Sequence, residues 1–289
     1  MAESNQNRFD SLIPPEMAAR AERVGVRKAH MDAVRTFALA VLAGAFIALG
    51  AIFATTVGAG ASGLPFGVVR LLAGTAFSLG LILVIVGGAE LFTGNTLIVM
   101  ARASGKVSTA LLLRNWAIVY AGNLVGAVAT ALVTFVGGQY AFGGGGVGLN
   151  ALAIGDAKAG LDFLPAVALG MLCNALVCLA VWLTFSARTT TDRILAIVPP
   201  IAAFVASGFE HSIANMYFIP VAMLIRSFAP DAFWTSSGAS ASDYANLTVG
   251  GLVGNLVPVT IGNIIGGAVM VGVVYWFVYL RPEKEARDR

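Results

Sequence analysis

The chain has 289 residues, of which 58% are hydrophobic and only 11% are charged. This composition excludes an ordinary water-soluble domain and is typical of an integral membrane protein. The formal net charge of +3 is too small to indicate a nucleic-acid partner, and no nucleic acid is expected to bind.

The N-terminal segment, residues 1–36, is polar and is predicted to lie in the cytoplasm. It lacks the short apolar core and the small-residue cleavage site of a signal peptide, so the apolar run that follows is expected to remain as a membrane anchor. An amphipathic surface helix is predicted from about Pro15 to Arg35, with Asp10 and Ser11 as candidate capping residues before it.

Residues 37–280 are predicted to form one membrane domain, followed by a cytoplasmic tail at 281–289. A spanning helix needs about 20 apolar residues. Six apolar segments meet this length, and they lie near 37–57, 71–100, 115–136, 165–186, 195–225 and 249–280. The second and the fifth segment are too long for a simple span.

The two long segments share an interruption. Residues 88–95 read GAELFTGN and residues 208–215 read GFEHSIAN, so both follow the pattern G-x-E-x-x-x-[GA]-N. Polar groups inside a membrane are expensive and usually mark a substrate path. A matched pair of interrupted helices therefore predicts a transport site near the bilayer midplane.

A second motif repeats in the same order. Residues 122–126 of the third segment read GNLVG, and residues 262–266 of the sixth read GNIIG. Each half of the chain then holds three spans, an odd number, so the two halves enter the membrane from opposite sides. The sequence predicts an inverted 3+3 repeat.

The distribution of cations predicts the orientation. With the N-terminus inside, the inner side holds all Lys and Arg residues except Arg70, Lys158 and Arg226. Fifteen inner cations against three outer ones is a strong positive-inside signal, and both termini are predicted to be cytoplasmic.

The carboxylates of the breaks are assigned a supporting role. A break in a membrane helix frees backbone N–H groups, and we expect Glu90 and Glu210 to accept hydrogen bonds from them. The alternative is direct contact with the substrate, although a carboxylate in the path would repel an anion.

His211 is the sharper candidate, because it lies inside the second break and histidine changes protonation near neutral pH. The alternative is a neutral histidine that forms hydrogen bonds between helices. Thr93 lies in the first break, where its hydroxyl can donate to a bound oxygen and a helix restarting just after Gly94 would favour negative charge. These features favour a small anion as the substrate.

Lys158 is the one cation predicted in the first outer loop, and it is expected to draw anions to the pore mouth. A plain solvated lysine is the alternative. No metal or cofactor is expected: Cys173 and Cys178 are five residues apart and point about 140° away from each other on a helix.

These motifs resemble those of the formate/nitrite transporter family. The resemblance rests on GGAELFTGN at 87–95 and ASGFEHSIANM at 206–216, and it extends over nearly the whole chain through 65–67, 123–127, 177–182 and 258–267. Within the family the chain is most similar to the bacterial formate channels.

The resemblance implies an all-α, aquaporin-like bundle of six spans with broken second and fifth helices. It also implies a homopentamer in the bacterial cytoplasmic (inner) membrane, with one pore in each protomer and lipid in the central hole. The expected substrates are formate and related small monovalent anions, which pass together with protons.

Carried over position by position, the resemblance implies a set of polar pore residues. The family's central histidine falls on His211, its loop threonine on Thr93 and its outer-vestibule lysine on Lys158, and further polar pore residues fall on Asn174 and Asn263.

The resemblance also implies two apolar constrictions. Phe77 and Phe204 are expected on the periplasmic side, Leu81 and Leu91 on the cytoplasmic side, and Phe92 in the same broken loop.

The mechanism expected from these residues begins with a weak-acid anion that loses hydration in an apolar slit, where Thr93 and His211 donate hydrogen bonds to it. Proton transfer through His211 then yields the neutral acid. The alternatives are a nitrite or hydrosulfide channel of the same family and a neutral-solute pore of the aquaporin type, although no Asn-Pro-Ala tripeptide occurs. A membrane enzyme using Glu210 and His211 lacks a supporting motif, and no enzymatic activity is expected.

A separate hypothesis concerns the N-terminal segment. It proposes that this segment, which contains His30, opens or closes the inner mouth in response to cytoplasmic pH.

Overall fold

The structure is a computed structural model that describes residues 10–61 and 63–281, and no β-strand occurs in these ranges. Residues 1–9 of the predicted N-terminal segment and residues 282–289 of the predicted tail lie outside the described part of the chain.

Five helices are each long and apolar enough to cross a membrane. They are α3 (Ala33–Gly58), α4 (Phe66–Gly87), α7 (Thr109–Val136), α9 (Phe163–Ser186) and α13 (Val249–Ile264) with its continuation through η4 (Ile265–Val273) and η5 (Trp276–Leu280). The fifth predicted segment consists of α10 (Thr190–Ala206) and α11 (Ser212–Phe228), which are separated by the second break.

Shorter helices complete the bundle. After the first break the chain continues through α5 (Phe92–Asn95), η1 (Thr96–Ile98) and α6 (Val99–Ala103). The others are α2 (Pro14–Ala29), η2 (Gln139–Ala141), α8 (Gly146–Ala159), α12 (Asp231–Ser237) and η3 (Ala241–Asp243).

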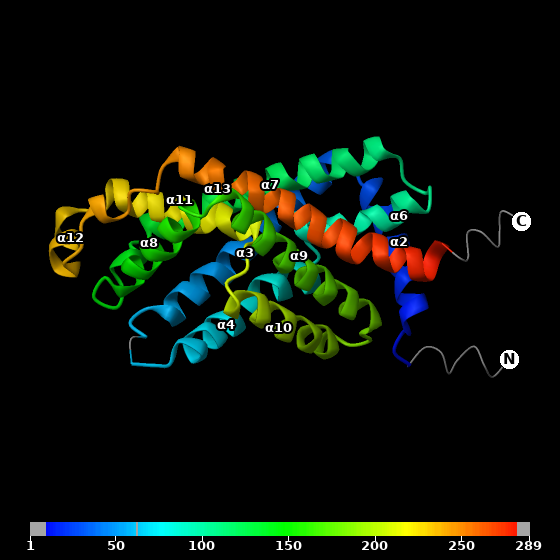
Figure 1. Ribbon diagram of the computed structural model, residues 1–289, viewed down its shortest axis with the longest axis horizontal. Helices are drawn as coiled ribbons and strands as arrows, with labels where there is room; N and C mark the ends of the chain where they lie inside the picture. The colour runs from blue at the N-terminus through cyan, green and yellow to red at the C-terminus, as the bar shows by residue number, and fades with distance from the viewer. Residues whose placement is uncertain (1–9, 62, 282–289) are drawn as a thin grey trace, which may run out of the picture.

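The bundle is elongated, and its two ends carry different helices. Helices α2 and α6 lie at the end where the red C-terminal helix finishes, whereas α8 and α12 lie at the opposite end (Figure 1).

Helix α2 ends earlier than predicted. The surface helix was expected to reach Arg35, but α2 stops at Ala29 and the spanning helix α3 already begins at Ala33. The reason is Asp32, whose carboxylate accepts hydrogen bonds from the backbone N–H groups of Val34 and Arg35 and so caps α3.

The start of α2 also differs. Neither Asp10 nor Ser11 caps it; the N-cap residue is Ile13, whose backbone N–H donates to Glu16 Oε2 over 3.1 Å. The apolar face of α2 packs on the protein, where Met17, Ala18 and Ala21 are buried.

The repeated G-N-x-x-G motif explains the closest helix contacts. A Cβ atom added to Gly126 would lie 2.0 Å from the carbonyl oxygen of Val41 in α3, and one added to Gly266 would lie 2.1 Å from that of Met171 in α9. Only glycine permits such an approach, so α7 packs tightly on α3 in the first half and α13 packs in the same way on α9 in the second.

Candidate transport site

Both breaks begin at a glycine in the left-handed region. Gly88 has φ +82° and Gly208 has φ +75°, a conformation that disfavours any side chain. The chain resumes helical geometry at Phe92 in the first half and at Ser212 in the second. The predicted restart after Gly94 is therefore wrong. After the sharp turn at Gly88, only residues 89–91 are non-helical before the helix resumes at Phe92.

Asn123 binds the backbone of the first break. Its Oδ1 accepts from the backbone N–H of Phe92 over 2.9 Å, and its Nδ2 donates to the carbonyl oxygens of Ala40 and Glu90. A buried polar group must find a partner within the protein, and this one amide satisfies three backbone groups.

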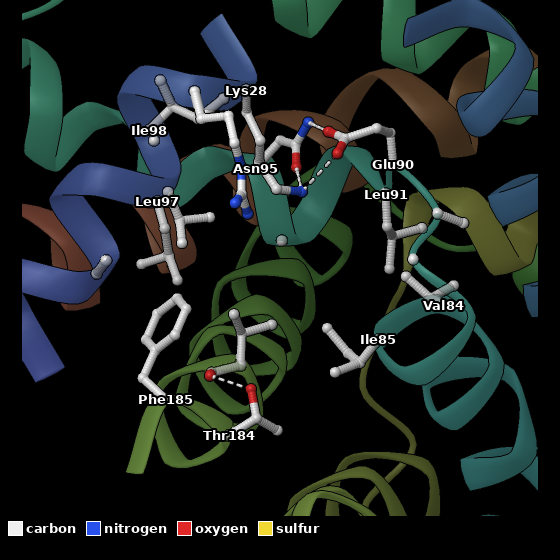
Figure 2. Close-up of a pocket in the computed structure, with 18 of the residues that line it drawn as sticks. Lys28, Val84, Ile85, Glu90, Leu91, Asn95, Leu97, Ile98, Thr184 and Phe185 are labelled. Atoms are coloured by element: carbon white, nitrogen blue, oxygen red, sulfur yellow. Dashed lines mark hydrogen bonds and ion pairs between the residues drawn. The ribbon is translucent and has the colours of Figure 1, made fainter. Parts of the chain in front are cut away.

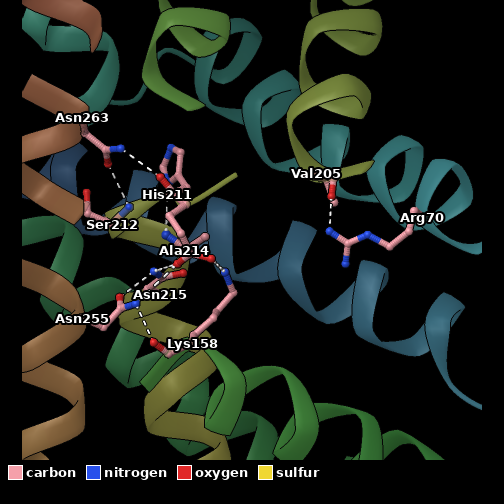
Figure 3. A network of polar contacts seen from close by, with 10 residues as sticks. Arg70, Lys158, Val205, His211, Ser212, Ala214, Asn215, Asn255 and Asn263 are labelled. Carbon is pink, nitrogen blue, oxygen red and sulfur yellow. Dashed lines mark hydrogen bonds and ion pairs between the residues drawn. The ribbon is translucent and has the colours of Figure 1, made fainter. Parts of the chain in front are cut away.

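Asn263 does the same in the second break. Its Oδ1 accepts from the backbone N–H of Ser212 over 2.9 Å, and its Nδ2 donates to the carbonyl oxygens of Gly170 and Glu210 (Figure 3). Asn263 was expected as a polar pore residue; the structure places it as a fully buried clamp on the backbone.

The glutamate side chains have other partners than expected. Glu90 pairs with Lys28 Nζ over 3.0 Å and accepts from Asn95 Nδ2 over 2.7 Å, rather than from freed backbone N–H groups. Asn115 completes this group, because it accepts from Asn95 and donates to the carbonyl oxygen of Lys28.

Glu210 has the equivalent set of contacts. It pairs with Lys158 Nζ over 2.7 Å and accepts from Asn215 Nδ2 over 2.7 Å. Asn255 accepts from Asn215 and donates to the carbonyl oxygen of Lys158 (Figure 3). The prediction that the carboxylates accept the freed N–H groups is therefore wrong: amides take those groups, and the carboxylates bind lysines.

The two networks establish the inverted repeat at atomic detail. Lys28 lies at the end of α2 and Lys158 at the end of α8, so α2 is the counterpart of α8. Each repeat therefore comprises a short helix, a span, a broken helix and a second span, and it includes α2, which the sequence analysis assigned to a separate segment.

Lys158 is neither a plain solvated lysine nor an isolated cation. Its side chain is 17% exposed, its charge is matched by Glu210, and its Nζ lies 5.6 Å from the centre of the Phe218 ring. The ammonium group is thus held at a fixed point beside the second break.

His211 and Thr93 meet between the two breaks. The Nε2 atom of His211 lies 3.1 Å from Thr93 Oγ1, and the two side chains are almost completely buried. The prediction brought these residues together from segments 118 positions apart in the chain, and the structure places them in contact.

The contacts of His211 assign its tautomer. Its Nδ1 caps α11 by accepting from the backbone N–H of Ala214 over 3.1 Å, so the ring proton resides on Nε2 and points to Thr93. Because Thr93 Oγ1 accepts this proton, its own hydroxyl hydrogen is available to a bound oxygen. The ring is neutral in this arrangement.

Asn174 supports Thr93 from α9. Its Nδ2 lies within hydrogen-bond distance of the carbonyl oxygens of Thr93 and Asn263 and of Thr96 Oγ1. Asn174 thereby ties the first break to the last helix, and like Asn263 it is fully buried.

Of the predicted constriction residues, Phe204 contacts the polar pair directly. The rings of Phe77 and Phe204 lie 5.6 Å apart at an angle of 82°, and the Phe204 ring stacks on His211 at 5.9 Å. Leu81 and Leu91 are buried as well, and Leu91 occupies in the first break the position of His211 in the second, directly after the glutamate.

Phe92 lies apart from these four. Its ring packs edge-on against Trp116 at 6.1 Å and Tyr120 at 5.0 Å, both in α7.

A cavity of about 450 Å³ opens at the end of the bundle that carries α2. Its apolar walls include Val84, Ile85 and Leu91 on one side and Leu97 and Phe185 on the other, and Lys28 and Glu90 lie at its polar end (Figure 2). Leu81 and Leu91 line it, whereas Thr93 and His211 do not.

The sequence analysis missed the cations of this cavity. Arg20, Arg27, Lys28 and Arg193 all line it, although they lie on two helices far apart in the chain. The sequence did offer one signal, the glutamate of the first break. A carboxylate inside an apolar segment needs a cationic partner. Lys28 was a candidate, because it belongs to the predicted helix directly before the first span.

Comparison with known proteins adds an independent result. The family model described as formate/nitrite transporter matches residues 15–277. The formate channel FocA of Escherichia coli (strain K12) is 49% identical over 276 residues, which cover 95% of this chain and 97% of that protein, and FocA of Haemophilus influenzae is 41% identical over 94% of this chain and 97% of that protein.

The fold also matches solved structures. A pentameric formate channel with formate bound superimposes with a TM-score of 0.82 at 50% identity, covering 86% of this chain and 98% of the other. An FNT family ion channel superimposes with a TM-score of 0.74 at 30% identity, covering 91% and 98%.

Proposed function

The chain belongs to the formate/nitrite transporter family, and on this premise we propose that it is a multi-pass membrane channel for formate. It is a channel and not an enzyme. The observation that carries the proposal is the buried Thr93–His211 pair. Its Thr93 hydroxyl hydrogen is available to an anion, and the Nε2–H of His211 supports this hydroxyl by donating to Thr93 Oγ1.

The pair suits a small weak-acid anion. Entering the slit between Phe204 and Leu91 strips water from the anion at a cost of several kcal/mol. The Thr93 hydroxyl replaces part of that hydration with a charge-assisted hydrogen bond, while the Nε2–H of His211 donates to Thr93 Oγ1. A neutral solute gains less from a hydrogen bond to this hydroxyl. Together with membership in the formate/nitrite transporter family, this argues against a neutral-solute pore of the aquaporin type.

We further propose that His211 passes a proton to the anion. A second proton on the ring enters at Nδ1, where the N–H of Ala214 now donates, so charging His211 opens the first turn of α11. The imidazolium then releases its Nε2 proton to formate, which leaves as the neutral acid, and the ring is left neutral with its proton on Nδ1. Loss of that proton and uptake of another at Nε2 restore the starting tautomer, in which Nδ1 accepts from Ala214. Glu210 does not supply this proton, because its carboxylate is bound to Lys158 and Asn215.

Assembly and location follow the same relatives. We propose a homopentamer with one pore in each protomer and lipid in the central hole, placed in the bacterial inner membrane with both termini in the cytoplasm. Its support is the pentameric relative and the distribution of cations.

The decisive experiment measures formate flux into proteoliposomes at several pH values, with nitrite and hydrosulfide as competitors. The wild-type protein is expected to conduct formate faster as pH falls, because more of the permeating acid is protonated. His211→Phe is expected to lose this pH dependence. His30→Phe changes the other histidine, at an exposed position, and tests separately whether the N-terminal segment contributes to the pH response.

Two results would contradict the proposal. If the pH dependence of formate flux is unchanged in His211→Phe, this histidine does not transfer the proton. A flux that nitrite or hydrosulfide carries much faster than formate reassigns the substrate within the family.

A further inference from the structure

The cavity at the end of the bundle that carries α2 contains more positive charge than the channel mechanism uses. Four cationic side chains line it, Arg20, Arg27, Lys28 and Arg193, and the carboxylate among its lining residues is that of Glu90. Lys28 pairs with Glu90, so three guanidinium groups remain without a compensating carboxylate in the cavity wall. We refer to Arg20, Arg27 and Arg193 as the arginine cluster.

One member of the arginine cluster is held by the protein, and no described carboxylate pairs with any of the three. Arg20 Nη1 donates to the carbonyl oxygen of Phe185 over 2.9 Å, which fixes this guanidinium at the wall. Within the described residues, the side chains of Arg27 and Arg193 make no hydrogen bond or ion pair. Burial lowers the pKa of Arg20 from its ordinary value, and the like charge of the neighbouring Arg193 lowers it further.

The cavity has the size and shape of a small-molecule site. Its volume of about 450 Å³ falls within the usual range of roughly 300–1,000 Å³ for ligand pockets. Its lining includes the apolar side chains of Leu81 and Leu91, so an anion with several charges that fills the mouth would lose hydration on moving further. Formate carries one charge and satisfies at most one guanidinium; three guanidinium groups match an anion with several charges.

We propose that this cavity binds a soluble anion of the phosphate class with several negative charges, and that the bound anion blocks the passage of formate from the cytoplasmic side. The planar fork of arginine matches phosphate oxygens, and a tetrahedral group offers acceptors in several directions at once. The blocking action rests on the proposed formate channel; the binding site itself does not.

The test uses inorganic pyrophosphate as the probe and the full-length protein. Its dissociation constant is measured by titration calorimetry at neutral pH against a monovalent salt of matched ionic strength. The double variant Arg27→Gln with Arg193→Gln is expected to bind about tenfold more weakly or worse, because two charge-assisted contacts are lost. Arg35→Gln removes an exposed cation outside the cavity and is expected to bind as the wild type does.

A second measurement tests the block. Formate flux in proteoliposomes of zwitterionic lipid is compared with and without pyrophosphate for each variant, so that changes in basal flux cancel. Pyrophosphate is expected to slow flux through the wild type and Arg35→Gln but not through the double variant. Binding that is absent, or equal in all variants, overturns the inference, and formate flux without any pyrophosphate effect overturns it while the proposed function stands.

A lipid headgroup presents the same phosphate chemistry, and a third arm separates the two sources. In vesicles that contain phosphatidylglycerol, unchanged pyrophosphate affinity supports a soluble ligand. If the anionic lipid alone slows flux in a manner that requires Arg27 and Arg193, and pyrophosphate no longer binds, the soluble assignment is overturned in favour of the lipid.

Discussion

At the scale of single residues, the buried glutamates of the two breaks each require a lysine as a charge partner. Glu210 is buried, and among the described residues its charge is paired with that of Lys158, with two asparagine amides nearby. Removing one partner of a buried pair leaves an uncompensated charge, which costs about 3–5 kcal/mol. Lys158 was expected to attract anions, so its two roles, as partner of Glu210 and as attractor, need to be separated.

We predict that Lys158→Met strongly lowers thermal stability and that Glu210→Gln added to it restores most of the loss, because no unpaired charge is then left. Unfolding of the purified protein in detergent measures this. Formate flux through the double variant separates the roles: slow flux at restored stability identifies Lys158 as an attractor, and restored flux identifies it as a partner of Glu210. A double variant as unstable as the single one would refute the pairing argument.

At the scale of elements, the two breaks depend on the glycines that flank the asparagine clamps. Gly126 and Gly266 let α7 and α13 approach their neighbours closely enough for Asn123 and Asn263 to reach the broken backbone. The glycine that permits close helix packing and the asparagine that binds the broken backbone thus act together, once in each half.

We predict that Gly266→Ala destabilises the protein by about 2 kcal/mol or more, because its methyl group would overlap the carbonyl oxygen of Met171 and force α13 outward. The displacement would also weaken the Asn263 clamp and reduce formate flux. Gly254 lies in α13, and apart from its own helix no atom of the described residues comes within 4 Å of the added Cβ, so Gly254→Ala is expected to be neutral. Thermal unfolding and flux of both variants check this, and equal stability of the two would contradict the packing argument.

Much of this element pattern was predictable from the sequence. The six segments and the two breaks followed from apolar length and from the repeated G-x-E-x-x-x-[GA]-N motif, and the second motif gave the inverted order. The partners of the glutamates were not predictable in this way. Lys28 and Lys158 lie outside the spans, and only folding brings them to Glu90 and Glu210. The restart at Phe92 was also missed, because it depends on an amide from α7.

At the scale of the whole molecule, the two halves meet between equivalent helices. Tyr120 in α7 and Thr260 in α13 each lie three residues before the asparagine of their half, and their side-chain oxygens are 2.9 Å apart. The protomer exposes many large apolar side chains, including Phe53, Leu71 and Val133, as a membrane-spanning bundle does.

We predict that the purified protein has a native mass of five times 29.8 kDa, the mass of one chain. The expectation follows from the pentameric relative. Native mass spectrometry in a mild detergent measures it, with formate flux of the same preparation as the control for folding. A stable dimer or tetramer that conducts formate would refute the pentamer.

The unequal occupants of equivalent positions have a kinetic consequence. Leu91 and His211 follow the two glutamates in matching places, so the scaffold is nearly symmetric across the membrane whereas the reactive groups are not. A passive pore cannot shift the equilibrium distribution of its solute by such a difference. The flux can, however, saturate at different solute concentrations on the two sides of the membrane. The reason is that a solute entering from each side meets different residues before it reaches His211. Initial rates of influx and efflux under mirrored gradients should therefore follow two different saturation curves that meet only at low concentration.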